Sequence, residues 1–299
     1  MEEFEKAKAW DKRRLADYIR RTSGVELDCA MVFDVQVKRF HAYKRQLLNV
    51  FKILDVYNRI LSDPSFDPRP TAFIFSGKAA QSYSFAKEVI RLINSVAEAV
   101  NGDARVNDKI RVAFVPNFAV SSAQLIYPAA EISEQISWAG SEASGTSNMK
   151  FMMNGAITLG TYDGANVEIA ELVGKNDIYT FGASSQEVER LYAEGSYDAF
   201  AHYSRPGVKL LVDFITNPRF MATGDAERLR RLHDDIVHKD WFMALLDLEE
   251  YIQLKERVYR DYEDRHAWIQ KALVNVAMAG TFSSDRTIAQ YDEDIWHLS

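Results

Sequence analysis

The sequence predicts an α/β fold: a doubly wound, mostly parallel, Rossmann-like sheet followed by an extended helical C-terminal region. Two observations carry this prediction. Short apolar runs alternate with helical patterns between residues 71 and 181, which is typical of a parallel sheet covered by helices on both faces. Beyond about residue 185, helical patterns continue without further strand-like runs. Ligands of such sheets bind beyond the carboxyl ends of the strands, so we expect a site in the loops that follow them.

Each element has its own signal. Apolar runs bounded by turn residues predict strands at 71–75, 110–115, 135–138, 156–160 and 178–181. Apolar residues recurring every three to four positions predict helices at 3–21, 46–61, 82–100, 123–131, 167–172, 186–193, 207–215, 226–237 and 241–279. We expect one domain over residues 1–299, with a leading helix or crossover at 1–24, an α/β core at 25–185 and a mainly helical part at 186–299.

The composition limits the classes of partner. The net charge of −7 and the pI of about 5.5 give the whole chain no electrostatic attraction to nucleic acid or to an anionic membrane, so any anion site must be local. A single cysteine, Cys29, excludes an internal disulfide framework. The charged N-terminus resembles no targeting peptide, and no run reaches the roughly 18 apolar residues that a membrane helix needs. We therefore expect a cytoplasmic protein.

The stretch "EASGTSNMKFMMNG", residues 142–155, follows a predicted strand. Its small residues at 144–147 allow a close approach of the backbone to a ligand, and a helix over 146–153 would point free N–H groups at a phosphate. Lys150 lies one turn into that helix, and its neighbours Met149, Phe151 and Met152 predict a partly desolvated, nucleophilic amine. The competing interpretation is a surface lysine on an amphipathic helix.

The segment "DVQVKRFHAYKRQ", residues 34–46, concentrates positive charge in an acidic chain. On a regular helix Lys38 and Lys44 would lie roughly 120° apart. If these side chains converge on one anion, the segment must therefore be a loop or a helix entry. Arginine and lysine together suit a phosphate dianion, because the guanidinium bonds bidentately and the ammonium acts as a point charge. The alternative is a solvated basic face.

A third feature is "GTYDGANVEI", residues 160–169, where Asp163 and Gly164 signal a turn before a helix. Taken alone, this stretch reads as a structural strand–turn–helix connection. The sequence contains no phosphate-binding P-loop motif, no cysteine and histidine spacing typical of zinc and no nucleophile elbow.

Together these stretches resemble the α-glucan phosphorylases, the family of glycogen, starch and maltodextrin phosphorylases. The stretch 142–155 is similar to the family's pyridoxal-phosphate motif, and the resemblance continues through "FDVQVKRFHAYKRQLLN", "AQLIYPAAEISEQIS", "GTYDGANVEI" and "MAGTFSSDRTIAQYDEDIW", in the family's order. It covers most of the chain from about Met31 to Trp296.

The resemblance implies an activity and a cofactor. Family members cleave terminal α-1,4-glucosidic bonds of a glucan with inorganic phosphate and release glucose 1-phosphate with retention. Lys150 would hold pyridoxal 5′-phosphate through a Schiff base, and the 5′-phosphate would exchange a proton with the substrate phosphate. The family's architecture is of the GT-B type, with two domains.

The resemblance also assigns roles to residues. Arg39 and Lys44 match ligands of the substrate phosphate and, with Lys150, are the candidate catalytic residues. Lys38 and the backbone of Thr146 and Ser147 match groups near the cofactor phosphate, although glycine is common in the family at position 147. Contacts to glucose hydroxyls are matched by Glu142, by the backbone of Ala143, Ser144 and Gly145 and, less closely, by Tyr43.

Family members are well over twice as long as this chain. We therefore expect the C-terminal domain alone, with the N-terminal half absent, weak or no cofactor binding and negligible turnover. The rival hypothesis is a non-catalytic truncated fragment that only folds or forms a homodimer. A sugar-nucleotide glycosyltransferase of the same architecture is disfavoured, because it would leave Lys150 without a role.

Overall fold

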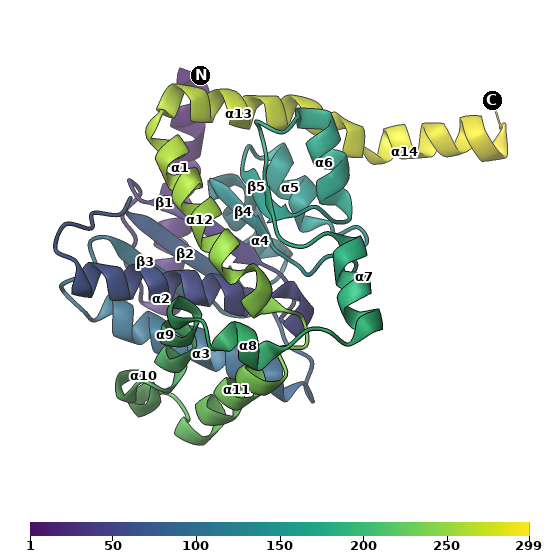
Figure 1. Cartoon of the computed structure of the whole chain (residues 1–299). Coiled ribbons are helices and arrows are strands. Elements are labelled where there is room, and N and C mark those ends of the chain that lie inside the picture. The colour runs from purple at the N-terminus through teal and green to yellow at the C-terminus, as the bar shows by residue number, and fades with distance from the viewer. Residues whose placement is uncertain (299) are drawn as a thin grey trace.

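The computed structural model describes residues 1–298 and has at its centre a six-stranded sheet, all of whose strands are parallel. The strands lie in the order β3-β2-β1-β4-β5-β6 (Figure 1). Their bounds are Val32–Val37, Thr71–Ser76, Ile110–Val115, Ile132–Gln135, Ile157–Thr161 and Tyr179–Phe181 for β1 to β6. This order confirms the predicted doubly wound, Rossmann-like α/β fold. Successive strands are added on one side of β1 as far as β3, and the chain then returns to add β4, β5 and β6 on the other side of β1, which makes the position between β1 and β4 the switch point of the sheet.

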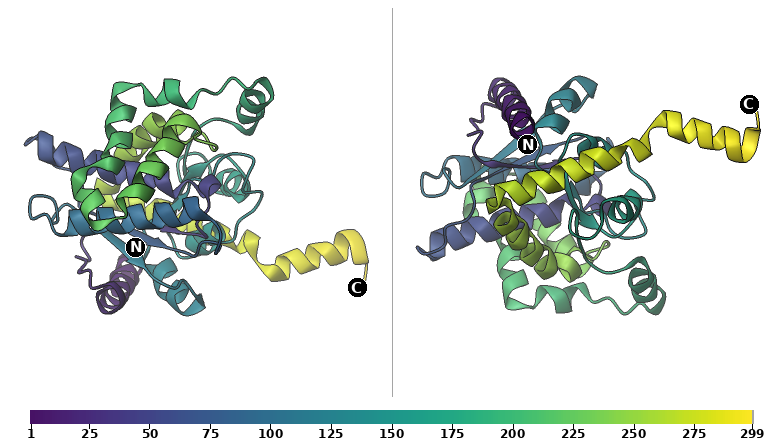
Figure 2. Two further views of the ribbon diagram at one scale, coloured as in Figure 1. Left: turned by 90° about the horizontal axis from the view of Figure 1, so that it is seen from below. Right: turned by 90° about the horizontal axis from the view of Figure 1, so that it is seen from above.

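Helices cover both faces of the sheet (Figure 2). α1 (Glu2–Ser23) and α4 (Val120–Ala129) pack on one face, against Phe33 and Val35 of β1. α2 (Gln46–Ser62), α3 (Ser84–Asn101) and α12 (Ala244–Glu263) contribute to the larger core on the other face. The remaining helices are α5 (Ser147–Met153), α6 (Ala165–Val173), α7 (Ser185–Glu194), α8 (Ala199–Tyr203), α9 (Pro206–Asp213), α10 (Pro218–Thr223), α11 (Ala226–His238), α13 (Arg265–Met278) and α14 (Ser284–Tyr291).

Three sequence predictions are corrected. β1 was not predicted, and β4 ends at Gln135, where the prediction placed the start of a strand. Both strands carry polar residues that interrupt an apolar pattern, yet every position in them is buried. The helical run predicted at 241–279 is divided into α12 and α13, because the Asp264 carboxylate accepts a hydrogen bond from the Ala267 N–H and begins a new helix.

A buried ionic cluster explains the polar residues of β1 and β4. The Lys255 ammonium on α12 donates hydrogen bonds to Asp34 of β1 and, over 2.6 Å, to Glu134 of β4. The hydroxyls of Tyr259 and Tyr251 donate to the same two carboxylates, each over 3.1 Å. Burial and the neighbouring Asp34 charge raise the pKa of Glu134, and the Lys255 ammonium opposes this rise. One ammonium thus joins two carboxylates on neighbouring strands from opposite halves of the sheet.

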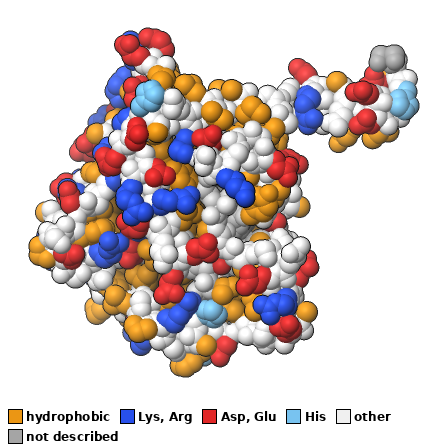
Figure 3. Space-filling view, turned by 45° about the horizontal axis from the view of Figure 1, so that its top comes forward, with side chains coloured by type: hydrophobic (Ala, Val, Ile, Leu, Met, Phe, Trp, Pro, Cys, Tyr) orange, Lys and Arg blue, Asp and Glu red, His pale blue; other side chains and the backbone are white. Residues whose placement is uncertain are grey.

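The C-terminal arm, residues 284–298, extends away from the body of the molecule (Figures 1 and 2). Its exposed side chains include Ile288, Ile295 and Trp296. On the face shown in Figure 3, acidic and basic side chains are interspersed, and the arm carries both hydrophobic and acidic groups. Within residues 1–298, none of the helices is long and apolar enough to cross a bilayer.

Candidate functional site

The candidate site lies where the sheet reverses its strand order, beyond the carboxyl ends of β1 and β4. Lys38 directly follows β1, and Ser137 and Glu142 follow β4. Because the two strands are parallel neighbours, the loops after them meet at the same edge of the sheet. The site's position therefore follows from the topology.

Two buried lysines converge on one carboxylate. Oε2 of Glu142 accepts hydrogen bonds from the Lys44 ammonium and, over 2.8 Å, from the Ser137 hydroxyl. The Lys38 ammonium lies 3.6 Å from the same oxygen. Lys38 and Lys44 are each only 8% exposed, so two charges are held away from water against one. These three side chains together carry a net charge of +1.

The segment after β1 is a loop, which allows Lys38 and Lys44 to approach the same carboxylate. A short 3-10 turn, Ala42–Lys44, begins at His41, whose Nδ1 accepts a hydrogen bond from the Tyr43 N–H. Arg45 follows with φ +52° and begins α2. Its buried guanidinium donates to the Ile136 carbonyl over 2.9 Å and to Asp247 over 2.6 Å. This arginine fixes the loop and leaves Lys38 and Lys44 directed at Glu142.

The pKa values of the cluster reflect burial and charge. Burial lowers the pKa of Lys38 to about 8, because the attraction of Glu142 is partly offset by the repulsion of Lys44. Burial alone would raise the pKa of Glu142, but the charge of Lys38 and the hydrogen bonds from Lys44 and Ser137 outweigh it and lower that pKa. Glu142 is therefore ionised at neutral pH.

The turn that carries Glu142 is held by the stretch 160–169, which the sequence alone presented as a simple connection. Oδ2 of Asp163 accepts a hydrogen bond from the Glu142 N–H over 3.2 Å. Gly164 has φ +53°, and a Cβ atom there would lie 2.0 Å from the carbonyl oxygen of Glu142. The Ala165 N–H donates to the Ser144 carbonyl over 3.3 Å. Asp163 and Gly164 thus position residues 142–145. In the sequence, this Asp-Gly pair indicated only a turn before a helix.

α5 begins and ends as predicted, but the environment of Lys150 differs from the prediction. Lys150 is exposed, and its ammonium lies 5.9 Å from the centre of the Tyr127 ring on α4. Among the described residues, this ammonium forms no hydrogen bond or ion pair. Phe151 and Met152 are fully buried and pack into two separate cores, so they do not cover the amine. The expectation of a desolvated lysine was wrong, because successive helical residues point in different directions.

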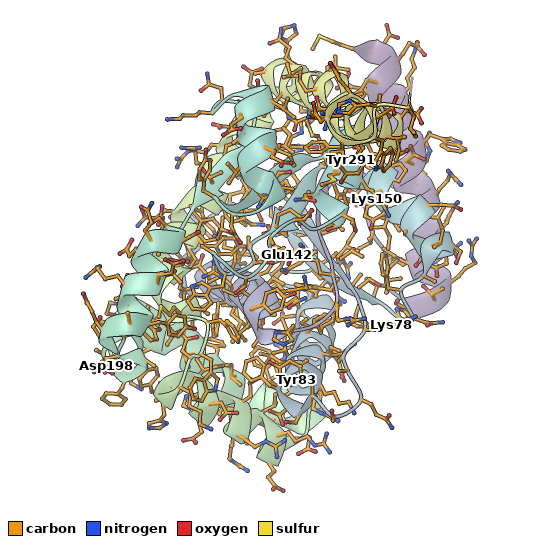
Figure 4. All side chains as sticks on the ribbon, turned by 90° about the vertical axis from the view of Figure 1, so that its right-hand side faces the viewer. Lys78, Tyr83, Glu142, Lys150, Asp198 and Tyr291 are labelled. Atoms are coloured by element: carbon orange, nitrogen blue, oxygen red, sulfur yellow. The ribbon has the colours of Figure 1, made fainter. Side chains whose placement is uncertain are left out.

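The other predicted site residues differ in how exposed they are and in what they contact. Arg39 is exposed, and only its backbone carbonyl is bonded, by the Gln46 amide. The Tyr43 ring is half-buried, 4.7 Å from the Lys44 ammonium. Thr146 is exposed, whereas the buried Ser147 hydroxyl lies 3.3 Å from the Gln135 amide nitrogen. Figure 4 shows Glu142 near the centre of the view and Lys150 above it. The structure brings the Lys38 and Lys44 side chains to Glu142, and within residues 1–298 no hydrogen bond or ion pair joins this cluster to the side chains of Arg39 or Lys150.

A small polar recess of about 200 Å³ opens beside the cluster. It is lined by Lys38, Gln135, Ser137, Glu142, Ser144, Asn148, Thr161, Asp163 and Asn166. Hydroxyl, amide and carboxylate groups can exchange hydrogen bonds with the hydroxyls of a sugar, and the one ammonium group in the lining, that of Lys38, can pair with an anion. Within residues 1–298, no cluster of side chains has the composition of a metal site.

The fold and the site define a doubly wound α/β domain with two buried lysines and one glutamate gathered at its switch point. The family model for carbohydrate phosphorylases matches residues 1–298, and the chain belongs to this family. It is 50% identical over 298 residues to a maltodextrin phosphorylase of Streptococcus pneumoniae, covering 100% of this chain and 40% of that protein. It is 48% identical over 289 residues to a glycogen phosphorylase of Haemophilus influenzae, covering 96% and 35%, and 47% identical over 300 residues to one of Bacillus subtilis, covering 100% and 37%. The chain thus spans well under half of the length of these relatives.

Proposed function

We propose that this chain is the cofactor- and phosphate-binding C-terminal domain of a pyridoxal-phosphate-dependent α-1,4-glucan phosphorylase. The observation that carries the proposal is the pair of buried ammonium groups, Lys38 and Lys44, that share the single carboxylate of Glu142. A net positive charge at a buried switch point is suited to phosphate. The names of the relatives supply the reaction class, phosphorolysis of a glucan.

In the proposed reaction, the terminal C1–O bond of an α-1,4-glucan breaks and a C1–O bond to inorganic phosphate forms with retention, giving glucose 1-phosphate. The departing 4-hydroxyl takes the proton that the phosphate gives up. Lys44 and the exposed, unpaired Arg39 hold the substrate phosphate. Glu142, the backbone of Ala143, Ser144 and Gly145, and the Tyr43 hydroxyl contact the sugar. Their cationic and polar groups offset the growing negative charge in the transition state.

The residues present suit pyridoxal 5′-phosphate. The Lys150 amine has no protein partner and borders an open hollow lined partly by Tyr127 and Met153, so it is available to a carbonyl compound. Lys38 and the backbone of Thr146 and Ser147 would hold the cofactor's phosphate. When bound, this cofactor supplies a second phosphate group that exchanges a proton with the substrate phosphate. Two neighbouring dianions repel each other, and the lysine pair reduces that repulsion.

The chain is proposed to be incomplete for catalysis. It spans 34–40% of the relatives' length, and the candidate site is open on the side of Arg39 and Lys150, both of which are exposed. We expect weak cofactor binding and negligible turnover without the remaining part. Turnover by this chain at the rate of a full-length relative would overturn this incompleteness.

Reductive trapping tests the cofactor assignment without requiring activity. The chain is incubated with pyridoxal phosphate and borohydride, and peptides are analysed by mass spectrometry. We expect labelling of Lys150 well above that of Lys175, an exposed lysine without a partner. The Lys150→Ala variant should lose the label, whereas Lys175→Ala should retain it. Equal labelling of both lysines would contradict a cofactor role for Lys150 and favour the rival, a non-catalytic fragment that folds or dimerises.

A further inference from the structure

A second cationic recess lies at the opposite edge of the sheet from the candidate site. Its volume is about 840 Å³ to its open mouth, and it sits beside the amino ends of β1, β2, β4 and β5. It is lined by Phe4, Glu5, Lys8, Ala9, Lys12, Cys29, Ala30, Arg69, Glu131, Gly155, Tyr262, Arg265 and Trp268. Four of these side chains are cationic and two are acidic, although the chain as a whole is acidic. We call it the amino-edge recess.

The carboxylate of Glu131 is fully used within the protein. It accepts hydrogen bonds from the Lys12 ammonium over 2.8 Å, from the Phe33 N–H over 3.0 Å and from the Tyr262 hydroxyl. Glu131 therefore neutralises Lys12. Its charge also acts on Arg265, 3.9 Å away, and on Lys8, so this one carboxylate balances the cations of the recess only in part.

Lys8 has hydrogen bonds but no direct ion pair. Its ammonium donates to the carbonyls of Pro128, Ala130 and Asn154 over 2.7–2.8 Å, and among residues 1–298 no carboxylate lies within ion-pair distance, although Glu131 and Asp11 act on it from farther away. Lys8 is 8% exposed, and burial lowers its pKa to about 8. A nearby anion would relieve the cost of this buried charge.

Two guanidinium groups at the recess keep buried N–H groups without a partner. Among the described residues, Nη1 of Arg265 and Nε of Arg69 are buried and unbonded, while Nη1 of Arg69 pairs with the Glu263 carboxylate over 3.2 Å outside the recess lining. Nη2 of Arg265 lies 3.9 Å from Glu131 and 4.0 Å from Glu5, too far for a hydrogen bond. Both guanidinium groups lie over the Tyr262 ring, at 4.2 and 5.2 Å from its centre, which holds them in place. Unsatisfied buried donors are rare in folded proteins and point to a missing acceptor.

We propose that the amino-edge recess binds a small oxyanion, a phosphate or carboxylate group carried by a metabolite, through the guanidinium groups of Arg69 and Arg265, with Lys8 adding positive charge but no free N–H group. The organic part of the ligand lies against Phe4. This binding site is separate from the candidate site and does not depend on the proposed function. The same chemistry could come from a carboxylate side chain in the additional length of the relatives, and the test below separates the two sources.

Cys29, the chain's single cysteine, is a built-in reporter because it lines the recess. Burial raises the pKa of its thiol, so alkylation is measured at alkaline pH. The rate with anionic iodoacetate is divided by the rate with neutral iodoacetamide. We expect Arg265→Gln and Arg69→Gln each to lower this ratio by about three- to tenfold, since each removes one nearby positive charge. Arg260→Gln, an exposed position outside the recess, should leave it unchanged.

The second part of the test measures binding, with inorganic phosphate as the ligand. In the unaltered chain it should slow iodoacetate alkylation of Cys29, and the protection should weaken by about tenfold in Arg265→Gln or Arg69→Gln. Thermal melts check that each variant is folded. Two variants are used so that the test still holds if one of them fails to fold. Protection that persists in both variants, or a rate ratio unaffected by them, overturns the proposal. Lowered ratios without any phosphate protection also overturn it and favour a polypeptide carboxylate as the natural occupant.

Discussion

Gly164 has a backbone conformation that side chains rarely adopt, and it also lies against the candidate site. Its φ is +53°, and an added Cβ would overlap the Glu142 carbonyl oxygen at 2.0 Å. The neighbouring Asp163 carboxylate holds the Glu142 N–H. A side chain at this position must therefore displace the turn that presents Glu142 to the two lysines.

We expect Gly164→Ala to lower the free energy of unfolding by about 3 kcal/mol or more, from backbone strain plus the overlap. Gly174→Ala is the matched control. Gly174 also has positive φ, +81°, but nothing lies within 4 Å of its added Cβ, so only about 1 kcal/mol should be lost. Urea denaturation measures both. Similar losses in the two variants would mean that the contact with Glu142 is unimportant.

Lys38 gives anion binding at the candidate site a characteristic pH dependence. Its pKa of about 8 means that the ammonium loses its charge as pH rises through 8. Sulfate, which does not titrate in this range, should therefore bind with constant affinity below pH 8 and more weakly above it. Lys38→Met should weaken sulfate binding by about tenfold at pH 7 and remove this inflection. Calorimetric titration measures both. An inflection that survives in Lys38→Met would assign it to another group, such as Lys8.

At the scale of elements, Lys255 holds together two strands that hydrogen bonding joins only briefly. β1 and β4 pair at two positions, Asp34 with Ile132 and Val35 with Ser133, whereas β1 and β2 pair at six. The ammonium of α12 reaches a carboxylate on each of the two strands. The position of the candidate site between β1 and β4 therefore depends on a helix that does not line it.

We expect Lys255→Met to lower the free energy of unfolding by about 3–5 kcal/mol, because Asp34 and Glu134 would remain buried without a cation. Lys209→Met, which removes an exposed lysine paired with Asp213, should leave stability nearly unchanged. Chemical denaturation compares the two variants. A small loss in Lys255→Met would show that a proton shared between Asp34 and Glu134 stabilises the buried pair about as well as the lysine does.

The same cluster explains which strands the sequence predicted. β2 and β3 are apolar runs, and their local pattern is sufficient to locate them. In β1, Asp34 is neutralised by a lysine 221 residues later, and the side-chain amide of Gln36 bonds the Lys44 carbonyl and the Asn49 amide. No local pattern contains such distant partners. The strands that flank the site were for this reason the hardest to predict.

The candidate site was also predictable only in part, because some of its residues are recognisable from the local sequence and others only from contacts between distant segments. Charge density identified Lys38 and Lys44, and geometry required their segment to be a loop, which the structure has. The contribution of Ser137 and the role of Asp163 depend on contacts across the sheet edge. The exposure of Lys150 could not be read from its chain neighbours, because these point into two different cores.

For the whole molecule, the distribution of charge matters more than its sum. A chain of net charge −7 concentrates buried cations at both edges of one sheet, around Glu142 and in the amino-edge recess. The net charge gives no general attraction to polyanions, while the two proposed sites would bind small anions locally. A net charge therefore describes the chain's solubility and not its binding chemistry.

The strand order also determines when the candidate site comes into being. During synthesis, β1, β2 and β3 emerge first and can pair as one half-sheet, whereas β4, β5 and β6 form a second half that meets the first only along the short β1–β4 seam. The lysine that closes this seam, Lys255, is made more than a hundred residues after β4. A ribosome-bound chain that has not yet released α12 holds two carboxylates at the seam without their cation. Its anion-binding centre should accordingly be among the last parts of the domain to assemble.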